Sequence, residues 1–171
     1  MPLTRNGKII EDRWTALATD APLPGNGDIL VSYARWRDDR EALRQHGGKV
    51  GIRLAGDESP ALIAEDLGRF DLIALEFPTF KDGRAYSHAR LLRERYGYRK
   101  ELRAVGNVLR DQYLFLHRCG FDTLEIADAA AASAWSEALS EISVAYQPAA
   151  DRRPWVTALR QANQDSGAAA E

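Results

Sequence analysis

The sequence predicts one α/β domain with a mainly parallel sheet of five strand–helix units, preceded by a short N-terminal strand arm. Three observations predict this class: five short apolar segments recur along the chain, a helical stretch follows each of them, and the connections between them are short. Such alternation is typical of βαβ units joined by right-handed crossovers. The length of 171 residues suits one domain.

The N-terminal part differs from the rest of the chain. Residues 8–19 are expected to form a short strand or the arm of a hairpin, and the prolines and glycines of 22–27 indicate a loop. We therefore divide the chain into a strand arm and loop at 1–26, the α/β domain at 27–148, and a C-terminal helix with a frayed tail at 149–171.

Five apolar segments are the expected strands of the sheet. They lie at Ile29–Tyr33, Val50–Leu54, Leu72–Phe77, Leu102–Val105 and Thr123–Ile126. Most have few charges and contain β-branched or aromatic residues, as strands buried on both faces do. The pattern does not give their order in the sheet. We favour an open flavodoxin-like order, and the alternative is a barrel-like half with the strands in sequential order.

Five helices are expected to follow these strands. They run over about Trp36–His46, from Pro60, over Ala85–Tyr96, from Asn107 to Cys119, and over Ala129–Ile142. Ser59 and Asn107 are the expected N-caps, because their side chains accept hydrogen bonds from free backbone N–H groups. Glycines follow the first, third and fourth of these helices, as is common after a helix C-terminus.

Composition excludes several classes of protein. The net charge of -2 gives no global attraction to nucleic acid or to an anionic membrane, and no apolar run approaches the length of about 20 residues that spans a bilayer. The N-terminus lacks an apolar segment of signal-peptide type. Cys119 is the single cysteine, so no intrachain disulfide can form. These features favour a cytoplasmic location.

Motifs for the common cofactors are absent from the sequence. It contains no GxxxxGK[ST] phosphate loop and no CxxC pair, and Gly25-x-Gly27 precedes a strand instead of following one. His46, His88 and His117 show no metal-ligand spacing, so we expect no metal site. No cofactor is evident, although a flavodoxin-like sheet can hold flavin through its strand-end loops without a universal motif, which leaves flavin open.

The longest strand-end loop, Glu76–Ser87, is the expected functional edge, because ligands of open parallel sheets bind beyond the carboxyl ends of strands. Residues with side chains suited to a small anion occur there and in the next loop: Arg84, Arg90, Asn107 and Arg110. Glu76 and Asp111 are weak candidates for acid–base catalysis. The alternative is that these carboxylates pair with the arginines and only fix the loops.

A basic helix face and an aromatic loop are candidates for partner binding. Residues 90–100 carry five basic side chains and a single acidic one. The candidate contact residues are Phe77, Phe80, Tyr86, Arg93 and Arg95. In the alternative interpretation, the charges form a solvated face, and the phenylalanines are core residues that close the end of the sheet.

Two runs of this chain resemble a known bacterial family. They are Leu75-Glu76-Phe77-Pro78-Thr79-Phe80-Lys81-Asp82-Gly83-Arg84-Ala85-Tyr86-Ser87-His88-Ala89-Arg90-Leu91-Leu92-Arg93, and Glu101-Leu102-Arg103-Ala104-Val105-Gly106-Asn107-Val108-Leu109-Arg110-Asp111-Gln112 with its continuation Arg118-Cys119-Gly120-Phe121-Asp122. The family is domain-of-unknown-function family 934, and the resemblance extends over about 27–148. Many relatives are expected to have Asp in place of Asn107.

The resemblance implies an association with sulfite reduction, in sulfate assimilation and cysteine biosynthesis, and its members are often described as oxidoreductases. It implies no catalytic residues. Six-electron reduction of sulfite needs a redox cofactor, because side chains cannot supply the electrons. The first hypothesis is therefore an accessory protein that docks with sulfite reductase or another sulfate-assimilation protein. The alternatives are an enzyme or carrier acting on a small sulfur oxyanion, and a sensor of a sulfur metabolite.

The lack of cofactor motifs predicts a colourless protein. The purified chain is expected to show no absorption band above the aromatic region, because its single cysteine and isolated histidines offer no pattern for a chromophore. A visible spectrum of the freshly purified protein tests this. A flavin or haem band at stoichiometric intensity would contradict it and would favour the enzyme hypothesis.

Overall fold

Eight strands form one sheet in the computed structural model, which describes residues 1–129, 132–141, 145–151 and 155–168. The strands are β1 (Leu3–Arg5), β2 (Lys8–Ile10), β3 (Thr15–Ala16), β4 (Ile29–Ser32), β5 (Val50–Leu54), β6 (Phe70–Phe77), β7 (Glu101–Gly106) and β8 (Thr123–Glu125). All five predicted strands are present, as β4 to β8. The N-terminal arm supplies three more.

The strand order is β2-β1-β8-β7-β6-β5-β4-β3. Neighbours from β3 to β8 pair in parallel, whereas β1 pairs antiparallel with both β2 and β8. The sheet is therefore mixed, which corrects the prediction of a mainly parallel sheet. The flavodoxin-like order is also wrong, because such a sheet reverses its winding in the middle. The sequential order is that of the alternative, the half-barrel.

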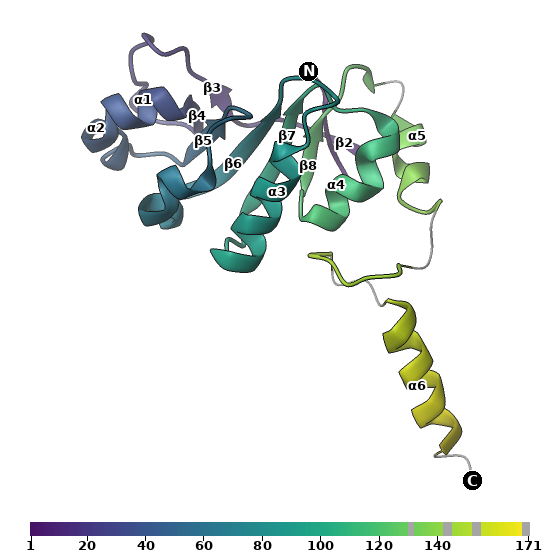
Figure 1. The fold of residues 1–171 in the computed structure, drawn as a ribbon. Coiled ribbons are helices and arrows are strands. Elements are labelled where there is room, and N and C mark those ends of the chain that lie inside the picture. Colours follow the sequence, from purple (N-terminus) through teal and green to yellow (C-terminus); the bar gives the residue numbers. More distant parts are fainter. Residues whose placement is uncertain (130–131, 142–144, 152–154, 169–171) are drawn as a thin grey trace.

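Short helices connect and follow the strands (Figure 1). They are α1 (Tyr33–Asp38), α2 (Arg40–Arg44), the 3₁₀ helix η1 (Pro60–Arg69), α3 (Arg84–Arg90) with its π-helical continuation η2 (Leu91–Arg95), the 3₁₀ turn η3 (Arg110–Gln112), α4 (Tyr113–Cys119), α5 (Ala132–Ala138) and α6 (Val156–Ala168). Among the described residues, no helix is long and apolar enough to cross a membrane.

Helix ends follow the local signals with one exception. Ser59 caps η1 by accepting a hydrogen bond from the backbone N–H of Ala61 at 3.3 Å. Gly120 ends α4 in the left-handed conformation, at φ 102°. The prediction that Asn107 caps a helix is wrong, because its Nδ2 donates to the carbonyl oxygen of Pro78 at 2.8 Å.

Near the C-terminus, two predicted segments extend beyond the described residues. The helix expected over 129–142 is present as α5, which ends at Ala138, because 139–141 form a turn; 130–131 and 142 lie outside the described residues. The predicted frayed tail overlaps α6, which runs to Ala168, and only 169–171 lie outside. Figure 1 shows α6 projecting away from the sheet.

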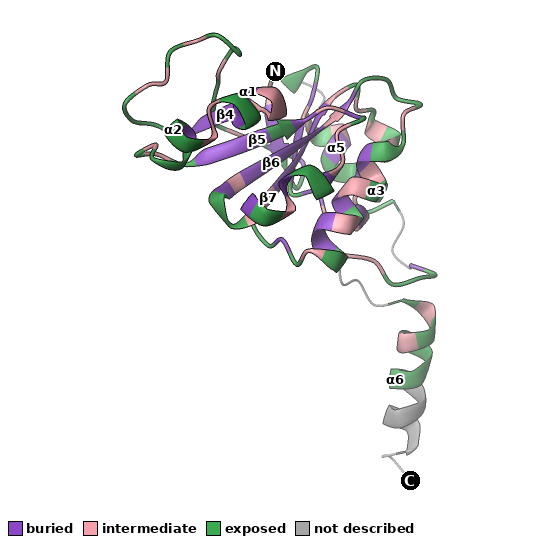
Figure 2. Ribbon diagram, turned by 60° about the vertical axis from the view of Figure 1, so that its left-hand side comes forward, coloured by how far each residue is buried: buried purple, intermediate pink, exposed green. Residues whose placement is uncertain are grey.

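The central strands are mostly buried (Figure 2), and a different apolar cluster lies on each face of the sheet. Right-handed crossovers between sequential parallel strands place their helices on one face. That face carries the main core, which includes Ile52, Ile73, Leu75 and Leu102. The opposite face carries a smaller apolar cluster, formed by Trp14, Leu30, Leu72, Ala74 and Val105.

A short link between the two edges of the sheet requires the sheet to curl. β2 and β3 are the two edge strands, yet only residues 11–14 connect them. A flat sheet of eight strands would be roughly 34 Å wide. The chain from Ile10 to Thr15 can span at most about 19 Å. The sheet therefore bends into a half-barrel, and the link crosses its concave face.

Two side chains of this link contact the centre of the concave face. Trp14 packs over Gly51 of β5, where an added Cβ would lie 3.2 Å from the indole ring. Asp12 pairs with Arg103 of β7, accepting from Nη1 at 2.7 Å and from Nη2 at 3.1 Å. Arg103 is 1% exposed and also pairs with Glu101 at 3.2 Å. A buried guanidinium thus holds the link against the sheet.

Asp12→Ala is expected to lower the free energy of unfolding by about 2 kcal/mol, because it removes one partner of a buried charge while Glu101 remains. Urea denaturation measures this. The matched control is Asp38→Ala, which breaks an exposed ion pair with Arg37 and should cost less than about 0.5 kcal/mol. Equal effects of the two substitutions would contradict the assigned role of the link.

Candidate functional site

The loop between β6 and α3 is fixed to its neighbours by backbone and side-chain hydrogen bonds. The carbonyl oxygen of Phe77 accepts from the backbone N–H of Asn107 at 2.8 Å. The carbonyl oxygen of Phe80 accepts from Nε2 of Gln112 at 3.1 Å. Gly106 has a φ of 92°, and a Cβ there would lie 2.5 Å from the Phe77 carbonyl oxygen, so only glycine permits this close approach. The two predicted loops are therefore adjacent, at the C-terminal ends of β6 and β7.

The arginines predicted to bind an anion do not converge. Arg84 pairs with Asp82 through three contacts of 2.6 to 3.2 Å. Arg90 pairs with Glu94, one turn further along the same helical segment. Arg110 donates to the carbonyl oxygen of Ala134 at 2.8 Å and to Glu141 at 2.6 Å. Each guanidinium thus has its own partner, and Asn107 is engaged with Pro78.

The acid–base candidates are also separated. Glu76, at the end of β6, pairs with Arg53 of β5 at 3.1 Å. Asp111 lies on the exposed surface of η3. Cys119 is buried, and burial raises the pKa of its thiol to about 11, so it is a core side chain as its helical position suggests. These placements favour the interpretation in which the loop charges fix the structure.

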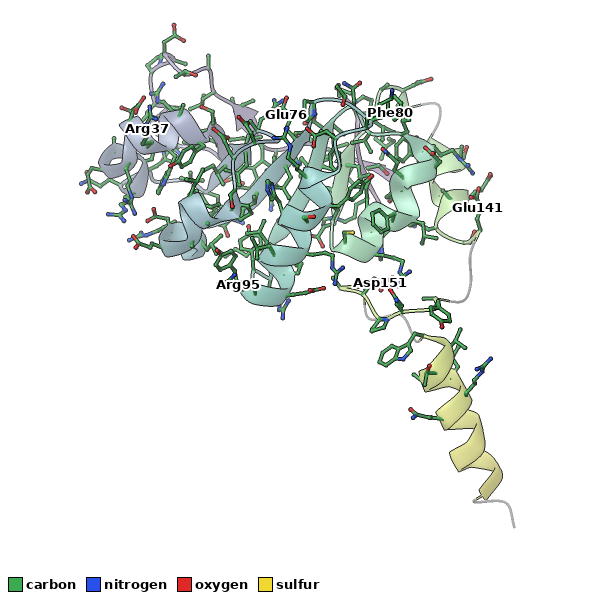
Figure 3. The ribbon with its side chains drawn as sticks, in the orientation of Figure 1. Arg37, Glu76, Phe80, Arg95, Glu141 and Asp151 are labelled. Atoms are coloured by element: carbon green, nitrogen blue, oxygen red, sulfur yellow. The ribbon has the colours of Figure 1, made fainter. Side chains whose placement is uncertain are left out.

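The predicted partner residues divide into buried and exposed side chains. Phe77 is 1% exposed and belongs to the core, which corrects its assignment to a contact surface. Arg93 is buried as well: it donates to the carbonyl oxygens of Gly120, Tyr98 and Lys100 and pairs with Asp122. Arg93 is therefore not available for contact on the basic face of residues 90–100. Arg95 is exposed, as predicted (labelled in Figure 3).

Phe80 belongs to an exposed apolar surface that we call the aromatic patch. Its exposed members are Phe80 (51% exposed), Leu109 (45%) and Phe115 (54%). Tyr86 lies half-buried beside them, and its ring centroid is 4.7 Å from that of Phe115. Gln112 connects Phe80 with Leu109, because its side chain donates to the carbonyl oxygen of Phe80 and accepts from the backbone N–H of Leu109. Figure 3 labels Phe80 at the strand-end edge of the sheet.

Two members of this patch were not predicted as contact residues. Leu109, Tyr113 and Leu116 have the i, i+4, i+7 spacing of one buried helix face, but the helix begins later, and Leu109 precedes it. Phe115 could have been found, because it lies outside the i, i+4, i+7 stripe and is therefore expected on the exposed side of the helix. An aromatic residue outside the apolar stripe was the available signal.

Comparison with known proteins finds one family. A model of a bacterial protein family of unknown function, DUF934, matches residues 51–156. That span includes β5 from its second residue, all of β6, β7 and β8, and all members of the aromatic patch. No curated protein and no solved structure gives a significant match.

The Asp82–Arg84 pair makes a testable prediction for pH. Hydrogen bonds from Arg84 lower the pKa of Asp82 to about 2. Because the carboxylate form is favoured in the folded state, the pair stabilises the loop fully above pH 4 and loses this contribution as the pH falls toward 2. A carbon-detected NMR titration of Asp82 is expected to give a pKa near 2, and Arg84→Gln should raise it toward the usual value near 4. An unchanged pKa in the variant would contradict this.

Proposed function

The chain belongs to the DUF934 family of bacterial proteins, and from this premise we propose that it is an accessory protein of assimilatory sulfite reduction that docks with sulfite reductase. The aromatic patch is the observation that carries the docking part of this proposal. The two sequence runs that resemble the family supply the pathway. They also contribute to the patch, because Phe80 and Tyr86 lie in the first run and Leu109 lies in the second, whereas Phe115 lies between the second run and its continuation.

The patch has the composition of an interaction surface. Soluble monomers seldom expose several large apolar side chains side by side, and contiguous patches of this kind commonly mark contact sites. Aromatic residues that become buried at an interface often contribute more than about 2 kcal/mol each. Phe80 and Phe115 are half exposed; Gln112 holds the backbone carbonyl oxygen of Phe80, and the ring of Phe115 packs against that of Tyr86. They are therefore suited to act as anchors that need little reordering on binding.

The charges around the patch favour a contact that depends weakly on salt. Arg84 and Arg110 are both paired within the chain, so they contribute little net attraction to an acidic partner. Nζ of Lys81 lies 5.7 Å from the ring centroid of Phe80, so this residue brings one positive charge to the patch. Affinity is thus expected to come mainly from apolar burial at the two phenylalanines.

A docking role is consistent with the chemistry of the pathway. Sulfite reduction transfers six electrons, which side chains cannot supply, so in this proposal the partner carries the redox reaction. The alternative, an enzyme or carrier acting on a small sulfur oxyanion, depended on converging arginines. Because Arg84, Arg90 and Arg110 each pair with a different carboxylate, the geometry favours docking.

The proposal predicts that Phe80→Ala and Phe115→Ala each weaken the complex with sulfite reductase from the same host by at least about tenfold, mainly through faster dissociation. Surface plasmon resonance with the immobilised chain measures both rate constants. Leu62→Ala is the matched control, because Leu62 is also 51% exposed but lies on η1, away from the patch. It should leave both rate constants unchanged.

Two results would contradict the proposal. One is the absence of a complex at micromolar concentration together with unchanged sulfite turnover on addition of the chain. The other is a complex that Leu62→Ala weakens as much as Phe80→Ala does. Growth of a deletion strain on sulfate as its sulfur source gives an independent readout of the pathway, and normal growth would count against it.

A further inference from the structure

A separate recess opens at the C-terminal ends of β3, β4, β5 and β6, away from the aromatic patch. Its volume is about 320 Å³, and its lining includes Leu17, Leu30, Ser32, Arg53, Glu58 and Glu76. It lies at the end of the sheet where α/β proteins commonly bind ligands. Glu76 and Phe80 are labelled at separate positions along this edge in Figure 3.

An ion pair between adjacent strands lies at the polar side of the recess. Nε of Arg53 donates to Oε2 of Glu76 at 3.2 Å, and Nη2 lies 3.1 Å from Oε1 in the same ion pair. A guanidinium has five N–H donors, so three remain for a ligand. The Glu76 carboxylate likewise keeps acceptor capacity, because each oxygen can accept a second hydrogen bond. The pair can therefore bind a ligand group of each sign.

The charged residues that line the recess determine which charged groups a ligand can place there. A simple anion at Arg53 would lie close to two carboxylates, those of Glu76 and Glu58, and would be repelled by both. A simple cation at Glu76 would lie beside the Arg53 guanidinium. A ligand with a carboxylate and an ammonium group satisfies both sides, because each group contacts a residue of opposite charge. The polar side thus fits a zwitterion.

The other side of the recess is apolar. Leu17 and Leu30 line it, together with the methyl groups of Ala16 and Ala34. Because none of these four lining residues is charged, a charged ligand side chain would lose solvation without gaining a partner among them. A short uncharged side chain would fit against these groups. We propose that the recess binds a small α-amino acid, with its carboxylate on Arg53 and its ammonium group on Glu76 and Glu58.

The walls of the recess are held in place without a ligand. The backbone N–H of Leu17 donates to the carbonyl oxygen of Leu30 at 2.9 Å. Arg35 is buried and donates to the carbonyl oxygens of Ala18 and Thr19, just beyond the wall formed by β3. The Glu58 carboxylate accepts from the backbone N–H of Ala55 at 2.8 Å. A site formed in advance loses less entropy when it binds a small ligand.

Calorimetric titration of the full chain with glycine, L-alanine, L-serine and L-valine tests the proposal. At least one of them should saturate the protein with a Kd below about 10 mM. Ethylamine and propionate carry one charge each and should bind at least about tenfold more weakly than the best amino acid. L-Glutamate and L-lysine should also bind more weakly, because their side chains would place a charge against the apolar wall.

Substitutions locate the site. Arg53→Gln and Glu76→Gln should each reduce affinity at least about tenfold, whereas the control Arg37→Gln, which removes another exposed ion pair, should have no effect. If a variant fails to fold, amide NMR shifts of the wild-type chain replace it: shifts on titration should concentrate at Ser32, Arg53 and Glu76. The proposal is overturned if no amino acid binds below 10 mM, if the single-charge analogues bind equally well, or if the shifts lie elsewhere.

Discussion

The link of residues 11–14 is shorter than the sheet that it crosses, and much of the structure depends on this constraint. Because so few residues join the two edge strands, the sheet has to curl. Side chains of the link then have to pack on its concave face. Of the link's four side chains, the ring of Trp14 and the carboxylate of Asp12 contact this face. Trp14 covers Gly51, and Asp12 neutralises Arg103, a guanidinium that would otherwise be buried beside Glu101 alone.

Local features of this fold were predictable, whereas long-range ones were not. The five central strands, the Ser59 cap and the glycine that ends α4 follow from signals within a few residues. The first hairpin could also have been predicted, because Asn6-Gly7 is a strong turn signal and both residues have positive φ. The order of the strands could not be predicted, because it depends on pairing between segments that are far apart in the sequence, such as β1 and β8.

The candidate site shows the same division. The Arg90–Glu94 pair has the i, i+4 spacing that predicts a helix surface pair, and Asp82–Arg84 is local as well. Arg110–Glu141 and Arg93–Asp122 join residues about 30 positions apart, and no pattern in the sequence indicates them. The basic residues of 90–100 were therefore interpreted as one surface, although Arg90 pairs with Glu94 and Arg93 pairs with Asp122 and with backbone carbonyl oxygens.

The pairing of β1 with β8 also affects how the chain is made. Thr4 pairs with Leu124, so the strand that leaves the ribosome early lacks its partner until some 120 further residues have been added. At bacterial elongation rates this takes roughly 6 to 24 s. During that interval the N-terminal hairpin can pair only with itself, and an isolated two-stranded hairpin is marginally stable in water. Completion of the half-barrel is therefore a late event of synthesis, and a nascent chain that stalls before β8 leaves open the edge of β7 that β8 would cover.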